Sequence, residues 1–149
     1  MEGIRDLFKD SIQVSLLDID YKAVTQEERN AVTRVRDSLD DLSFDGENLK
    51  LIVSRYVYFE PKARFDLKVT YSVTYFTRND KSEELAKVLV SDIFSEVKSN
   101  TSRYASPAMN NVSLVIAVIT SSFWNNPLVT PPNLIIPKVK ENGTGVATF

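Results

Sequence analysis

Apolar and polar residues alternate most regularly between Arg64 and Thr77. The apolar positions are Phe65, Leu67, Val69, Tyr71, Val73 and Tyr75. Because successive side chains of a strand point to opposite faces, this alternation predicts a strand with one apolar and one polar face. Residues 49–59 are rich in β-branched and aromatic side chains, and residues 60–63 (EPKA) supply a turn. The two segments predict an antiparallel hairpin over residues 49–77.

A third strand is predicted over residues 11–23, and its apolar positions change parity part-way. The alternation places Ile12, Val14 and Leu16 on one face, then Leu17, Ile19 and Tyr21 on the other. Such a change indicates either a β-bulge or a strand that is buried on both faces. Before this strand, residues 4–9 (IRDLFK) favour about one helical turn.

Two segments between and after the strands favour helices. Residues 25–28 (TQEE) have the form of a capping box, which predicts a helix over residues 26–39, although the β-branched content leaves a strand open. Residues 40–48 predict a turn. Ser82 followed by two glutamates predicts a helix start, and an apolar stripe continues the helix to about Ser99.

The last third of the chain predicts a helix followed by an extended segment. Ser106 and Pro107 form a helix start signal, so a helix is expected over residues 108–123, with a strand as the alternative. Four prolines between residues 127 and 137 then exclude regular structure. We expect residues 1–137 to form a single domain and residues 138–149 a flexible tail.

Composition excludes several classes of protein. The 149 residues contain no cysteine and no histidine, which removes disulfides, Cys/His zinc sites and nucleophiles based on either residue. A net charge of −2 gives no electrostatic basis for binding nucleic acid. Glycine-rich phosphate loops are absent. The apolar runs are too short to span a membrane, so we expect no membrane insertion and a cytoplasmic location.

An acidic group could suggest a metal site, but the favoured interpretation is a solvated turn. Its members are Asp37, Asp40, Asp41, Asp45 and Glu47, and they do not fit the EF-hand pattern. No metal and no cofactor are expected. A carboxylate pair for acid–base catalysis stays open as an alternative, because such pairing depends on the fold.

Aromatic residues provide the more informative candidates. One side of the 49–59 strand carries Leu51, Val53, Val57 and Phe59, and the other carries Ile52, Tyr56 and Tyr58. One face can pack on helices, while the second needs another cover. That cover is either a subunit interface or extra core, or the face is an open binding surface for peptide. Trp124, the only tryptophan, either closes the helix end or borders a groove.

The C-terminal third resembles the SecB family of export chaperones. In that family a helix entered through a proline-containing turn is followed by an apolar segment of the type F-P-x-L-x-L-P-P-x-N-F. Here Ser106 and Pro107 precede the helical segment, and residues 123–134 (FWNNPLVTPPNL) follow it with similar spacing. The 49–77 hairpin looks like two central strands of the family, and residues 11–23 look like its first strand.

The resemblance implies an α+β fold, with a four-stranded antiparallel sheet and helices packed on one face, assembled as a dimer of dimers. It implies an ATP-independent holdase that binds unfolded polypeptide in apolar grooves, for protein export or for protection of an antitoxin. The expected groove residues are Tyr56, Tyr58, Phe59, Phe123, Trp124, Leu128 and Leu134. In the export branch, acidic residues of the sheet contact the SecA motor, and Asp18 and Asp20 lie on a comparable first strand, so they are the expected partner-binding residues.

Two other functional classes stay open at this point. A structural or assembly protein would bury the same apolar surfaces permanently in a homo-oligomer. A small enzyme would instead show a polar pocket with perturbed carboxylates.

Overall fold

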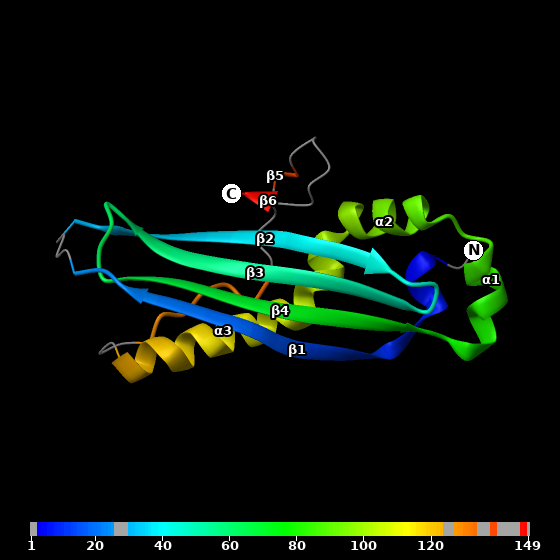
Figure 1. Cartoon of the computed structure of the whole chain (residues 1–149), viewed down its shortest axis with the longest axis horizontal. Helices are drawn as coiled ribbons and strands as arrows, with labels where there is room; N and C mark the ends of the chain where they lie inside the picture. Colours follow the sequence, from blue (N-terminus) through cyan, green and yellow to red (C-terminus); the bar gives the residue numbers. More distant parts are fainter. Residues whose placement is uncertain (1–2, 26–29, 124–126, 134–137, 140–146, 149) are drawn as a thin grey trace.

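The computed structural model describes residues 3–25, 30–123, 127–133, 138–139 and 147–148. Four long strands, β1 (Phe8–Ala23), β2 (Val32–Phe44), β3 (Asn48–Glu60) and β4 (Phe65–Thr77), form one antiparallel sheet in the order β1-β4-β3-β2. The helices pack on one side of this sheet (Figure 1). The fold is α+β, as the sequence predicts.

The remaining elements follow the sheet in the chain. A short 3-10 turn, η1 (Ile4–Leu7), precedes β1, and η2 (Asn79–Lys81), α1 (Ser82–Ala86) and α2 (Val90–Ser99) follow β4. The long helix α3 (Thr101–Phe123) then runs back beneath the sheet (Figure 1). Two short strands, β5 (Lys138–Val139) and β6 (Ala147–Thr148), pair with each other, and β6 lies against β2. The predicted flexibility of residues 138–149 stays a prediction.

The core lies between the sheet and α3. The alternating residues of β3 and β4 that face the helices are buried, and α3 contributes Tyr104, Ala105, Ala108, Met109, Val112 and Ile116. Complete burial of a large aliphatic side chain stabilises the folded state by roughly 1.5–3 kcal/mol. Phe65, Val69 and Val73 are all buried on the face of β4 that packs on the helices, which confirms the predicted apolar face.

The parity change in the first strand is a β-bulge. The register of β1 against β4 shifts between Leu16 and Asp18, so Leu17 is the extra residue. As a result Ile19, opposite Val69, lies on the same face as Leu16, opposite Tyr71. A matching shift in β2 makes Asp40 its extra residue. The Asp40 carboxylate accepts hydrogen bonds from Ser38 Oγ (2.6 Å) and Ser54 Oγ.

The helix predicted over residues 26–39 is wrong in its described part. Residues 32–39 belong to β2, and the first residues of the predicted helix, 26–29, lie outside the described residues. Val35, Asp37 and Leu39 all face the helices, opposite Val57, Arg55 and Val53. A buried aspartate between two apolar residues hid the alternation of a strand and left a spacing of four that resembles a helix.

Three boundaries also differ from the predictions. The turn predicted over residues 40–48 is shorter, because β2 continues to Phe44. The helix predicted over residues 82–99 is two helices, α1 and α2, separated by residues 87–89. The helix predicted from residue 108 begins at Thr101 and contains Pro107, while its predicted end at residue 123 is confirmed. A proline tolerated inside a helix cannot be distinguished from one that begins a helix without tertiary information.

Candidate functional site

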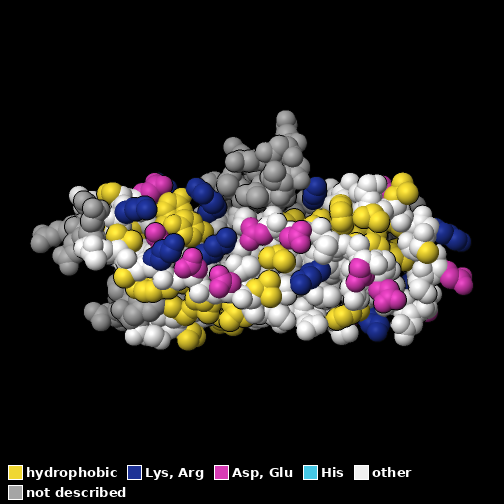
Figure 2. Space-filling model, in the orientation of Figure 1, with side chains coloured by type: hydrophobic (Ala, Val, Ile, Leu, Met, Phe, Trp, Pro, Cys, Tyr) yellow, Lys and Arg dark blue, Asp and Glu magenta, His cyan; other side chains and the backbone are white. Residues whose placement is uncertain are grey.

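The sheet has an open face, which we define as the face turned away from the helices. Tyr56 and Tyr58 lie there with their rings stacked, 4.9 Å between centroids, and the Arg36 guanidinium lies 5.6 Å from the Tyr58 ring centre. Burial, reinforced by the nearby carboxylate of Asp66, raises the pKa of Tyr56. Figure 2 shows this face, with an apolar group toward one end bordered by lysine and arginine side chains.

A small charged cavity of about 90 Å³ lies beside Tyr56 on the open face. Asp20 and Lys22 of β1, with Asp66 and Lys68 of β4, form the rest of its lining. Cations and anions alternate around it, so it does not select one sign of ligand charge. Its volume is well below the roughly 300–1,000 Å³ of typical small-molecule sites.

Both acidic residues expected to contact a partner lie on the open face. Asp18 is paired with Thr70 and Asp20 with Lys68, and both aspartates are exposed. Their role in partner binding stays a prediction.

The opposite, helix-covered side carries exposed apolar residues along its border. Leu16, Ile19 and Tyr21 of β1 are 46%, 40% and 41% exposed. Leu114 and Val118, one turn apart on α3, are 65% and 63% exposed. Because α3 packs against β1, we call these five residues the β1–α3 surface. Apolar side chains gather along the lower left border in Figure 2, over β1 and α3.

Strand β1 is also an edge of the sheet. Only β4 pairs with it in the described part of the chain, so one row of its main-chain N–H and C=O groups has no strand partner there. A long edge strand of this kind is a template for pairing with another chain. The β1–α3 surface therefore combines apolar side chains with a strand edge.

A short extended segment, residues 127–133, lies across the helix side of the sheet, and we call it the strap. Ser113 Oγ of α3 donates a hydrogen bond to Thr130 O (2.6 Å), and Leu128 N donates to Thr120 Oγ1 (2.7 Å). Arg55 NH1 donates to Thr130 Oγ1 (2.9 Å) and to Pro131 O, and its NH2 donates to Asn133 O (3.1 Å).

The Arg55 side chain is held by a buried carboxylate. Its Nε and NH2 groups donate to the two oxygens of Asp37, at 2.6 and 2.7 Å, and both side chains are completely buried. The two residues lie opposite each other on β3 and β2. A buried ion pair of this bidentate geometry fixes the orientation of the guanidinium toward the strap.

The residues expected to form one groove are distributed over several places. Tyr56 and Tyr58 lie on the open face, whereas Phe59 is a core residue, 1% exposed, with its ring edge-on to Phe65 at 5.1 Å. Leu128 of the strap is half-buried against the core. Phe123 ends α3, and Trp124 and Leu134 lie outside the described residues. The described members therefore do not line one groove, and their role in polypeptide binding stays a prediction.

Burial sets Phe59 apart from the other expected groove residues. Its side chain is enclosed between the sheet and the helices, so an external polypeptide cannot contact it in this conformation. The sequence placed Phe59 correctly on the Leu51, Val53 and Val57 face but did not indicate which face the helices cover.

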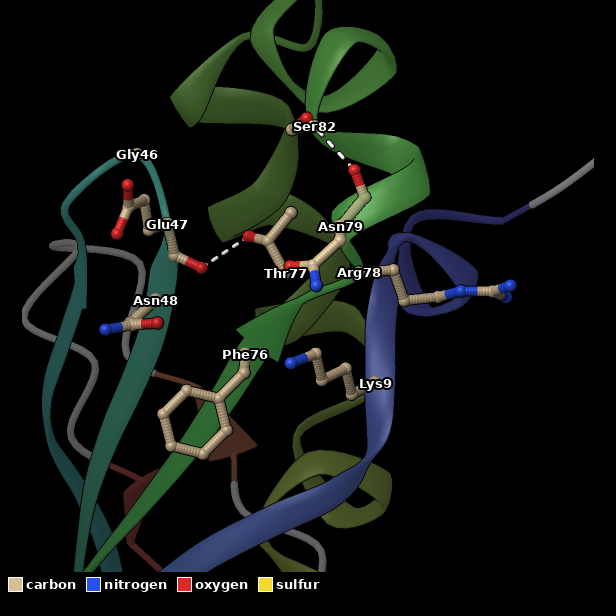
Figure 3. Close-up of a pocket in the computed structure, with 9 residues that line it drawn as sticks. All are labelled: Lys9, Gly46, Glu47, Asn48, Phe76, Thr77, Arg78, Asn79 and Ser82. Atoms are coloured by element: carbon tan, nitrogen blue, oxygen red, sulfur yellow. Dashed lines mark hydrogen bonds between the residues drawn. The ribbon is translucent and has the colours of Figure 1, made fainter.

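A larger pocket of about 400 Å³ lies at the end of the sheet where β4 ends and the turn joins β2 to β3 (Figure 3). Lys9, Glu47, Phe76 and Arg78 are among the residues around it. The Glu47 carbonyl oxygen accepts hydrogen bonds from Thr77 N (3.0 Å) and Thr77 Oγ1. Arg78 extends away from the cavity and binds Asp80. The only carboxylate in this lining is Glu47, so the pocket does not provide the carboxylate pair that acid–base catalysis would need.

Sequence reasoning missed Arg55 and interpreted its partner Asp37 as part of a solvated turn, whereas Asp37 is a buried residue of β2. The available signal was a charged residue on a face that is otherwise apolar, since Arg55 follows Leu51 and Val53 at the same parity. No group of carboxylates able to hold a metal ion occurs among the described residues. Of the helices described, none is both long enough and apolar enough to cross a membrane.

Comparison with known proteins identifies the fold. Neither a protein-family model nor a curated protein sequence matches the chain. The solved structure of the Mycobacterium tuberculosis Rv1957 SecB-like chaperone, in complex with a ChAD peptide from the Rv1956 HigA1 antitoxin, matches with a TM-score of 0.57 and 10% identity. The match covers 89% of this chain and 91% of that one. This chain has a SecB-like fold.

A second solved structure, a protein of unknown function from Streptococcus agalactiae, matches more weakly. Its TM-score is 0.36 at 12% identity, over 83% of this chain and 97% of that one.

Proposed function

We propose that this protein is a cytoplasmic, ATP-independent chaperone that holds unfolded or extended polypeptide. The β1–α3 surface carries the proposal, because it exposes large apolar side chains beside an unpaired strand edge. The similarity to a SecB-like chaperone that was solved with an antitoxin peptide adds support at the level of the fold.

The surface suits an extended client for two physical reasons. Leu114 and Val118 offer apolar contact area, and the neighbouring β1 edge offers main-chain hydrogen bonds to a chain of any sequence. Several such weak sites on one oligomer would raise the overall affinity through effective concentration. Assembly as a dimer of dimers, with either an export motor or an antitoxin as partner, belongs to the same proposal.

A permanent homo-oligomer without chaperone activity is the second candidate. The same observation favours it, since two β1 edges can pair with each other and bury Leu16, Ile19 and Tyr21. The two candidates differ in the apolar surface that remains after assembly. A chaperone oligomer binds the dye ANS, whereas a fully closed assembly does not.

Aggregation suppression tests the proposal directly. Light scattering from a thermally unfolding model enzyme is measured with stoichiometric amounts of this protein and without ATP. The double variant Leu114→Glu and Val118→Glu loses suppression, whereas the control Val32→Glu retains it, because Val32 is an exposed apolar residue (53%) on the open face. Absence of suppression by a folded wild-type protein that binds no ANS would sink the chaperone proposal and favour the closed assembly.

A further inference from the structure

The strap is held mainly by hydrogen bonds to its main chain, together with the side chains of Leu128 and Thr130. Val129 is 79% exposed, and Pro127, Pro131 and Pro132 are also exposed. Only Thr130 is buried, at 4%, and Leu128 is half-buried. In contrast, three carbonyl oxygens of the strap, those of Thr130, Pro131 and Asn133, accept hydrogen bonds from Arg55 and Ser113.

Two of the three residues that hold the strap are completely buried, and Ser113 is half-buried. Thr120 is completely buried, and Arg55 is completely buried with Asp37 behind it. Two N–H groups of the guanidinium bind Asp37, and the others point at the strap. Ser113 and Thr120 lie seven residues apart on α3, two turns along one side of the helix. Together they form a row of donors and one acceptor that matches an extended peptide backbone.

We propose that Arg55, Ser113 and Thr120 form a main-chain recognition site for extended polypeptide, and that the strap is its resident occupant, which an unfolded client displaces. This inference rests on the polypeptide-binding function proposed above. A site that reads carbonyl oxygens accepts any extended segment, because those groups are the same in every sequence. The strap thereby competes with clients and shields the buried guanidinium when no client is present.

The competition predicts opposite effects on client binding for a variant in the strap and a variant in the recognition site. Thr130→Val removes the hydroxyl that Arg55 NH1 binds and so weakens only the occupant. The fraction of protein with an open site rises, and the apparent affinity for a client rises in proportion, by roughly tenfold for the loss of one charge-assisted hydrogen bond. Ser113→Ala removes a group of the site itself and weakens client binding relative to Thr130→Val.

The first experiment measures binding of fluorescently labelled, carboxymethylated α-lactalbumin, a permanently unfolded chain, by anisotropy. Wild type, Thr130→Val, the double variant Thr130→Val with Ser113→Ala, and the control Thr33→Val are compared after circular dichroism has shown that each is folded. Thr33 is an exposed β2 residue, so its variant matches the chemistry of the Thr130 change without touching the strap. Tighter binding by Thr130→Val alone supports displacement. Weaker binding by Thr130→Val, or binding equal to that of Thr33→Val, overturns displacement. Either result would mean that the client binds without removing the strap from Arg55.

A second probe keeps this inference separate from the chaperone proposal. The synthetic peptide Pro-Leu-Val-Thr-Pro-Pro-Asn copies residues 127–133 of the chain. It is expected to bind Thr130→Val and to bind the double variant several-fold more weakly. If the unfolded protein binds no variant, the proposed function fails, while peptide binding to Thr130→Val still supports the site. If the peptide does not bind Thr130→Val, the recognition site is refuted.

Discussion

Single charged and hydroxyl groups inside the core join separate elements of the fold. Arg55 and Asp37 are completely buried and join β3, β2 and the strap through one guanidinium. Tyr75 and Tyr104 join the sheet to α3, because the Tyr75 hydroxyl donates to the Tyr104 carbonyl oxygen at 2.6 Å. The Tyr104 hydroxyl is itself buried without a hydrogen-bond partner among the described residues.

Replacement of Arg55 by Met is expected to lower the free energy of unfolding by about 3–5 kcal/mol. The change leaves the Asp37 carboxylate buried opposite an apolar side chain. A buried charge without its partner destabilises the folded state strongly. The matched control is Arg34→Met, which removes the exposed pair of Arg34 with Glu60 (3.2 Å) and costs at most about 1 kcal/mol. Urea denaturation measures both, and equal losses would contradict the role assigned to Arg55.

Tyr104 is expected to make the protein less stable at alkaline pH. Burial raises the pKa of Tyr104 from 10.0 to about 12, so the unfolded chain loses this proton at lower pH than the folded one. The free energy of unfolding therefore falls as pH rises through this interval, by about 2–3 kcal/mol in all, and the contribution is fully present below the unfolded pKa.

Tyr104→Phe tests this assignment. The variant is expected to be as stable as wild type near neutral pH, or more stable by about 1 kcal/mol, because the lost hydroxyl has no partner. Its stability should fall less steeply in the alkaline range, with the remaining slope owed partly to Tyr75, whose pKa burial also raises. Urea titrations at several alkaline pH values measure the slope, and identical slopes would contradict the account.

At the scale of elements, the sequence predicted those features that depend on residues close together in the chain. The 49–77 hairpin, the parity change near Leu17 and the end of α3 were readable because alternation, turn residues and prolines act over a few positions, although the parity change left a bulge and a strand buried on both faces as alternatives. The identity of β2 was not readable, because Arg55 on the adjacent strand β3 buries the Asp37 carboxylate on the apolar face, and this aspartate interrupts the alternation that marks a strand. The sequence also indicated that aromatic residues lie on two faces of β3 but not which face the helices cover.

Deletion of Leu17 is expected to preserve the fold. Leu17 is the extra residue of the β1 bulge, so its removal leaves Leu16 and Ile19 on their present face and costs about 1 kcal/mol. Deletion of Ser72 from β4, where the register with β3 is regular, moves every later or every earlier side chain to the other face and prevents folding. Circular dichroism and thermal denaturation distinguish the two, and an unfolded Leu17 deletion would contradict the bulge assignment.

At the scale of the whole molecule, the sheet divides the surface into two sides with different chemistry. The open face is mainly polar, with the stacked Tyr56 and Tyr58 at one end. The helix side combines the β1–α3 surface with the strap, and both offer contacts that suit an extended chain. The similarity to a SecB-like chaperone covers most of both chains and supports this arrangement of layers.

The most direct test asks which side of the sheet contacts an unfolded client. The photo-crosslinking amino acid p-benzoylphenylalanine is placed at Val118, on the helix side, or at Tyr58, on the open face, and each protein is irradiated with carboxymethylated α-lactalbumin. Both positions accept a large ring because Val118 is exposed and Tyr58 already carries one. We predict crosslinks from position 118 and none above background from position 58. Crosslinks from position 58 alone would place the client on the open face and contradict the account.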